Sequence, residues 1–154
     1  MDDDQCETSN ASRPSRPAKK PSVDVELTVA FYDVDMMEIV WHGHYARYFE
    51  VARDALLDHI NYNYAQMRAS GYSWPVVDMR VRYARPARFK QRLRIRATLS
   101  EWQQRMKIVY EIRDAESGIR LTRGHTVQVA VVTASGTLCS HSPAALIERL
   151  EKFI

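Results

Sequence analysis

The sequence predicts an α+β domain in which an antiparallel sheet wraps around one long central helix. Only one stretch of the chain has apolar side chains at helical spacing over about five turns. One alternating segment comes before it and four come after it. Sequential strands joined by short turns form an antiparallel sheet, and the apolar face of such a sheet needs a cover. The long helix is the only candidate for that cover.

The first predicted strand runs over residues 23–34. Its apolar and polar side chains alternate for part of its length, as they do in a strand with one buried face. From His42 the period changes to that of a helix with one buried stripe. The stripe consists of Tyr45, Tyr48, Phe49, Ala52, Leu56 and Ile60. Residues 61–75 then lead the chain out of the helix, with Gly71 and Pro75 as breakers.

After these breakers most of the chain is predicted to be strand. Residues 79–83, 93–99 and 106–113 alternate between apolar and polar side chains. The turn AESG separates the third of these strands from a fourth, which becomes more apolar towards its end. The last segment, SPAALIERLEKFI, is predicted to be a helix with Ser142 as its N-cap and Pro143 at its first position.

The composition is that of one globular domain. No apolar run approaches the roughly 20 residues that span a bilayer, so no membrane span is expected. Residues 1–22 are rich in Ser, Pro and charged residues and lack the apolar core of a secretory signal. They are predicted to be a disordered tail, and residues 23–154 a single domain of a cytoplasmic protein. Cys6 and Cys139 form no CxxC pair and no zinc-site spacing, so a structural disulfide is not expected.

The charge is unevenly distributed. The net charge is only +3, from 22 Lys+Arg against 19 Asp+Glu. Between Arg80 and Arg96, however, arginines recur with almost no acids, so one surface is expected to be positive. Such a surface suits an anionic ligand. Nucleic acid is disfavoured as a partner, because the chain has no RNA-binding aromatic motif.

The most informative stretch is FYDVDMMEIVWHGHYARYFEVAR, residues 31–53. It gathers acids and histidines where the predicted strand meets the long helix: Asp33, Asp35, Glu38, His42 and His44. An active site, a metal site and a polar turn are all compatible with such a cluster. The spacing matches no standard metal site, so neither a metal nor a cofactor is expected. A serine nucleophile is disfavoured because no G-x-S-x-G elbow occurs.

This stretch resembles the signature of the single-domain hotdog acyl-CoA thioesterases. That group includes the 4-hydroxybenzoyl-CoA thioesterases and the Tol-Pal-associated short acyl-CoA thioesterases. The resemblance rests on the Asp-x-Asp pair, the Val-Trp-His turn at residues 40–42, and FEVAR at residues 49–53. The downstream RYARPARF resembles the group's segment entering the third strand. The resemblance covers about residues 25–133 and implies the hotdog architecture, a sheet wrapped around one central helix.

The resemblance implies hydrolysis of an acyl thioester of coenzyme A or of acyl carrier protein. It assigns Asp35 as general base or nucleophile, and the backbone N–H groups around His42 and Gly43 as oxyanion donors. The sequence agrees, since it puts an acid just before a helix N-terminus, whose unpaired N–H groups favour negative charge. Turn-capping is the alternative role for Asp35, and it is the expected role for Asp33.

Two residues depart from the group's pattern, because Glu38 stands where Gly is usual and His44 where Asn is usual. Glu38 is either an added acid at the substrate site or a solvated loop residue. His44 either contacts the substrate or only supports the loop. Trp41 and Tyr45 are further candidates for substrate contacts, although an aromatic stripe is also ordinary core.

Arg85 and Arg88, at a predicted strand end, are candidates for binding the phosphates of coenzyme A or an acidic carrier protein. The resemblance also implies a homodimer or homotetramer, because the group pairs two protomers into one sheet. The alternative function is that of a non-catalytic acyl-binding or scaffolding protein in a lipid or polyketide pathway. A dehydratase is less favoured, since no facing pair of His and acid is evident.

Overall fold

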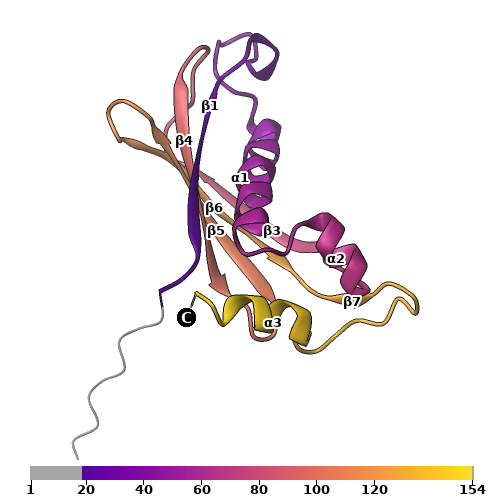
Figure 1. The fold of residues 1–154 in the computed structure, drawn as a ribbon. Helices are drawn as coiled ribbons and strands as arrows, with labels where there is room; N and C mark the ends of the chain where they lie inside the picture. The colour runs from indigo at the N-terminus through magenta and orange to yellow at the C-terminus, as the bar shows by residue number, and fades with distance from the viewer. Residues whose placement is uncertain (1–18, 154) are drawn as a thin grey trace, which may run out of the picture.

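The computed structural model describes residues 19–153. A five-stranded antiparallel sheet curves along one long helix, α1 (Tyr45–His59), so the predicted α+β architecture is confirmed (Figure 1). The strands of this sheet are β1 (Ser22–Thr28), β3 (Val76–Tyr83), β4 (Arg92–Glu101), β5 (Met106–Asp114) and β6 (Arg120–Gln128).

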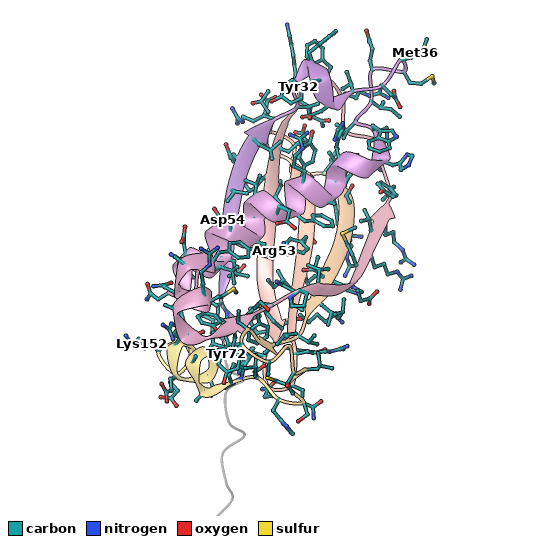
Figure 2. The ribbon with its side chains drawn as sticks, turned by 90° about the vertical axis from the view of Figure 1, so that its right-hand side faces the viewer. Tyr32, Met36, Arg53, Asp54, Tyr72 and Lys152 are labelled. Carbon is teal, nitrogen blue, oxygen red and sulfur yellow. The ribbon has the colours of Figure 1, made fainter. Side chains whose placement is uncertain are left out.

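Shorter elements lie around this framework. They are the 3-10 turns η1 (Phe31–Asp33) and η2 (His42–His44), the helices α2 (Tyr64–Ser70) and α3 (Ala144–Leu150), and the paired strands β2 (Tyr72–Ser73) and β7 (Val131–Val132). Helices α2 and α3 lie at the same end of the sheet (Figure 1). Figure 2 shows Tyr32 and Met36 at the opposite end of the molecule from Tyr72 and Lys152.

The strand order is β1-β4-β5-β6-β3. β4, β5 and β6 follow one another as predicted for strands joined by short turns. β3, by contrast, does not pair with its successor β4. It pairs with β6 at the far side of the sheet, while β1 pairs with β4. β3 is therefore an edge strand, and the chain segment that follows it lies beside the start of α1.

The core lies between α1 and the inner face of the sheet. The predicted helix stripe is buried, and the ring of Phe49 stacks on that of Tyr110 with centroids 4.4 Å apart. Burial of each such aromatic or leucine side chain stabilises the fold by roughly 1.5–3 kcal/mol. Arg53, next to the stripe on α1, is also buried. Its guanidinium forms an ion pair with Glu50, and its Nε donates a hydrogen bond to the Tyr64 hydroxyl at 3.3 Å.

Three local predictions are wrong. The first strand ends at Thr28, because the chain turns through η1 instead of continuing to residue 34. Residues 61–75 contain the helix α2, which Asn63 and Gln66 cap by accepting hydrogen bonds from each other's N–H. Ser142 is not the N-cap of α3, since Pro143 occupies that position.

The helices of residues 19–153 include none that is long and apolar enough to cross a bilayer. Most of the predicted tail, residues 1–18, lies outside the described part of the chain.

Candidate active site

A tight hairpin connects η1 to η2. Val34 bridges to Val40, the Asp35 N–H donates to the Ile39 carbonyl at 2.9 Å, and the Glu38 N–H donates to the Asp35 carbonyl at 3.0 Å. Glu38 has a φ of 62°, in the left-handed region that favours glycine. The turn therefore keeps the backbone shape that a Gly would adopt, and the glutamate side chain is carried outward into solvent.

Asp33 is held in the interior. Its carboxylate accepts hydrogen bonds from the Tyr48 hydroxyl at 2.8 Å and the Ala30 N–H at 3.2 Å, and it forms an ion pair with Arg47. Burial raises the pKa of Asp33, but the hydrogen bonds and Arg47 outweigh it and bring this pKa below its usual value. These contacts tie η1 to α1, so Asp33 has the structural role expected for it.

Asp35 is exposed, in contrast to Asp33. Its Oδ1 accepts a hydrogen bond from the Met37 N–H at 2.8 Å, which closes the turn. Within the described residues this is the one hydrogen bond recorded for the carboxylate. Turn-capping and catalysis are thus compatible, because one oxygen holds the loop while the other can face a ligand.

A cavity of about 360 Å³ lies beside Asp35 at the start of α1. Its walls come from the hairpin, the helix start and the segment after β3: Asp35, Ile39, Val40, His42, Tyr45, Tyr83, Ala84, Arg85 and Pro86. The walls are tied together, since the Tyr83 hydroxyl donates to the His42 carbonyl at 2.7 Å and the Ala87 N–H donates to the Tyr45 hydroxyl at 3.3 Å. The Tyr45 and Tyr83 rings also meet edge to face, 5.0 Å apart.

The N-terminal end of the helix keeps free donors. In η2 the His44 N–H donates to the Trp41 carbonyl at 2.9 Å. For the His42 and Gly43 N–H groups, no acceptor is recorded among residues 19–153. The Trp41 ring covers Gly43 so closely that a Cβ at residue 43 would lie 2.2 Å from it. Gly43 therefore allows the indole of Trp41 to pack directly on the backbone at the N-terminus of the helix.

The other predicted site residues lie in different places. Glu38, Trp41 and His44 are not among the residues that line the cavity, and their contact with substrate stays a prediction. Arg85 lines the cavity and also a second one of about 280 Å³, which Arg88 borders. Arg85 and Pro86 line both cavities, so the two cavities adjoin, and together they are called the arginine groove below.

That groove also contains an acid. Asp114 lines the second cavity together with Arg88 and Gln91. Hydrogen bonds, first from the Ser117 N–H and then from Gln91, lower the pKa of Asp114 to about 2, so it is ionised at neutral pH. Within residues 19–153 no three His, Cys, Asp or Glu side chains are close enough to hold a metal ion.

Tyr83 is the main site residue that sequence reasoning missed. Its position in the alternation of β3 predicts only an inward-facing strand residue. It was recognisable solely from its place as the second residue of RYARPARF, two residues before the predicted Arg85. Ile39 and Ala84 were also missed, since apolar residues in loops carry no signal of their own.

Comparison with known proteins identifies the family. The sequence pattern of the thioesterase-like superfamily matches residues 29–150. The chain belongs to this superfamily. A Synechocystis protein named as a proposed esterase is 29% identical over 130 residues, which are 84% of this chain and 78% of that protein. YneP of Bacillus subtilis, named as a proposed acyl-CoA thioesterase, is 34% identical over 64 residues, 42% of this chain and 46% of YneP.

Several solved structures have the same fold. The DHNA-CoA thioesterase of Staphylococcus aureus is 25% identical, with a TM-score of 0.71 over 77% of this chain and 80% of that one. The protein TT1821 of Thermus thermophilus is 26% identical, with a TM-score of 0.75 over 85% and 98%. A 4-hydroxybenzoyl-CoA thioesterase variant, 18% identical, has a TM-score of 0.73 over 84% and 98%. The predicted resemblance to hotdog thioesterases is confirmed.

Proposed function

We propose that this thioesterase-superfamily protein hydrolyses acyl thioesters of coenzyme A at the cavity beside Asp35. One observation supports the proposal most directly. The exposed carboxylate of Asp35 and the free N–H groups at the N-terminus of the helix lie at the same cavity of about 360 Å³. The names of the Staphylococcus and Bacillus relatives support coenzyme A as the carrier. Carrier-protein thioesters are the alternative substrates.

The chemistry follows from these groups. The thioester oxygen would accept hydrogen bonds from the N–H groups of His42 and Gly43, which stabilise the negative charge that develops on it. Asp35 would either remove a proton from the attacking water or attack the carbonyl carbon itself. In both routes water supplies the hydroxyl of the free acid, the carbon–sulfur bond breaks, and the thiolate takes up a proton.

Tyr83 is assigned a positioning role. Its hydroxyl donates to the His42 carbonyl, which belongs to the same peptide group as the Gly43 N–H. A hydrogen bond to this carbonyl polarises the peptide and strengthens its N–H as a donor. Tyr83→Phe is expected to lower kcat roughly three- to tenfold with little change in KM. Tyr45→Phe is the matched control, because the Tyr45 hydroxyl contacts Ala87 instead; an equal loss of kcat there would contradict the role of Tyr83.

Coenzyme A recognition is assigned to the arginine groove. Arg88→Gln is expected to raise KM for acyl-CoA roughly tenfold or more, because a charged hydrogen bond to phosphate is lost. The same change should leave hydrolysis of the matching acyl-pantetheine unaffected, since that substrate lacks the nucleotide phosphates. Arg94→Gln is the control, as Arg94 is paired with Glu26 on another part of the sheet. Equal effects on both substrates would rule out phosphate recognition.

A homodimer through β3 would complete the site. β3 is an edge strand with exposed apolar side chains, among them Val77 (57% exposed) and Met79 (47%). Antiparallel pairing with a second copy would set the Tyr83 end of one β3 beside the Val76 end of the other. The residues before Val76 line an apolar cavity of about 430 Å³. The acyl group would thus extend from the Asp35 cavity of one protomer into this cavity of its partner.

Met79→Lys is expected to convert the dimer into a monomer and to abolish activity with it, because pairing of the two β3 strands would bury the charge on the inward face of the joined sheet. Light scattering after gel filtration, at several protein concentrations, gives the mass and the assay gives the activity. Leu138→Lys is the control, since Leu138 is an exposed apolar residue that lies outside β3. A monomeric variant with full activity would contradict a site shared between protomers.

The proposed function is tested by free-thiol release from a panel of acyl-CoA thioesters with aryl, short and long acyl groups. The same acyl groups are offered on carrier protein. We expect turnover of at least one acyl class on coenzyme A, and slower turnover on carrier protein. Binding of every thioester without hydrolysis would instead identify a non-catalytic acyl-binding protein.

A further inference from the structure

The outer face of the sheet, turned away from α1, is divided by charge. Over β1 and β4 the arginines are neutralised by acids on the neighbouring strand. Arg94 lies 3.0 Å from a Glu26 oxygen, and Arg96 lies 2.8 Å from Asp24. The pairs follow the β1–β4 register, in which Glu26 is opposite Arg94 and Asp24 is opposite Arg96. This half of the face therefore carries little net charge.

Over β3 and β6 the arginines face other basic side chains across the β3–β6 pair. A Cβ at Gly124 would meet the Phe49 ring of α1, so this residue faces inward and Arg123, next in the strand, faces outward. Arg82 lies directly opposite Arg123 in the register, and Arg80 lies opposite His125. Like charges directly opposite one another destabilise a sheet. In the described part of the chain no ion pair is recorded for Arg80, Arg82 or Arg123.

These side chains surround a hollow of about 280 Å³. Its lining is Arg80, Arg82, Lys107, Val109, Arg123, Gly124 and His125. Two acids lie near it. Glu111 is opposite Arg123 in the β5–β6 register, but its carboxylate pairs with Arg113. Asp78, 65% exposed, lies 3.6 Å from the His125 ring. Lys107 is only loosely matched, 3.9 Å from Glu101. The hollow thus gathers three arginines, Arg80, Arg82 and Arg123, for which no ion pair is recorded among residues 19–153.

We propose that this hollow binds a small phosphate-bearing ligand of the size of a diphosphate ester. The planar guanidinium groups of facing arginines match the oxygens of phosphate groups, to which arginine donates two parallel hydrogen bonds. The volume lies just below the roughly 300–1,000 Å³ of sites for drug-sized ligands, so it suits a compact anion. The hollow shares no lining residue with the Asp35 cavity, and the proposal does not depend on thioester hydrolysis.

A bound anion would offset the electrostatic repulsion between Arg82 and Arg123, which lie opposite each other. An anion between Arg82 and Arg123 replaces their repulsion by two attractions. Without ligand, Arg82→Gln is therefore expected to raise the melting temperature slightly, whereas pyrophosphate is expected to raise that of the unmodified protein. Arg82→Gln should not respond to pyrophosphate in this way. If Arg82 were only solvated, pyrophosphate would not raise the melting temperature of the unmodified protein, and Arg82→Gln would not change the response to pyrophosphate.

Isothermal titration calorimetry of the full chain with inorganic pyrophosphate tests the site. We expect Arg82→Gln and Arg123→Gln each to weaken binding roughly tenfold or more. Arg96→Gln removes the same charge from the neutralised half of the face and is expected to leave binding unchanged. Citrate, a carboxylate polyanion, should bind more weakly than pyrophosphate.

Three results would overturn the proposal. Equal weakening by Arg96→Gln would show a general charge effect. Equal affinity for citrate would exclude recognition of phosphate. Far tighter binding of oligonucleotides, with an affinity that grows with their length, would show that the face binds nucleic acid instead of a compact ligand. Each result leaves the proposed thioesterase activity untouched, since that activity is measured at a separate cavity.

Discussion

Asp35→Asn is expected to lower kcat for thioester hydrolysis by about 10²–10⁴-fold, because an amide can neither accept the proton from water nor attack the carbonyl. The fold should persist. The Asn side chain keeps an oxygen that can accept the hydrogen bond from the Met37 N–H, so the turn remains closed. Release of free coenzyme A under substrate saturation measures kcat, and thermal melting verifies the folded state.

A matched control is Glu116→Gln, which removes one acid from the exposed turn between β5 and β6. Its activity should equal that of the unmodified protein. If Asp35→Asn retained most of its activity while Glu116→Gln was also active, the catalytic base would have to be another group. The cavity beside Asp35 would then be a binding pocket without a catalytic carboxylate.

Asp33→Asn is expected to destabilise the fold by about 2–3 kcal/mol at neutral pH. The change removes the charged acceptor of the Tyr48 hydroxyl and of the Arg47 guanidinium in a site that is 2% exposed. For a chain of this size the melting temperature should fall by roughly 5–10 °C. Arg47→Gln should have a smaller effect, under about 1 kcal/mol, since Arg47 is half exposed and water screens its charge.

The effect of Asp33→Asn should depend on pH. The pKa of Asp33 is lower in the folded protein than in the unfolded chain, where it is about 3.9. The stabilisation is therefore fully present above this value and is lost as the pH falls through the folded pKa. Urea unfolding at pH 7 and at pH 3 should show the difference between the two proteins narrowing at the lower pH. A constant difference would mean that the charge of Asp33 contributes nothing.

Local patterns in the sequence were sufficient for most of the framework. The apolar stripe from Tyr45 to Leu56 and the alternation in β4 and β5 reflect burial on one face, which is encoded within each element. The position of Asp35 shortly before the start of the helix could also be recognised from the local sequence. The missed helix α2 also had a local signal, the pair Asn63 and Gln66 three residues apart, which forms a capping box.

Features that depend on contacts distant in sequence could not be predicted. The pairing of β3 with β6 skips two strands, and no local pattern distinguishes it from pairing with β4. The cavity joins Asp35 and His42 to Tyr83, some 40 residues later, through that topology. The different environments of Asp33 and Asp35 arise because the chain turns at η1, which alternation could not reveal.

The different roles of the two aspartates are the central claim, and one paired measurement tests it directly. Coenzyme A release by Asp35→Asn and by Asp33→Asn is measured at a temperature where melting curves show both variants folded. We expect Asp35→Asn to be stable and nearly inactive, and Asp33→Asn to be less stable but active. An active Asp35→Asn beside an inactive, folded Asp33→Asn would contradict the claim and move the catalytic role to Asp33.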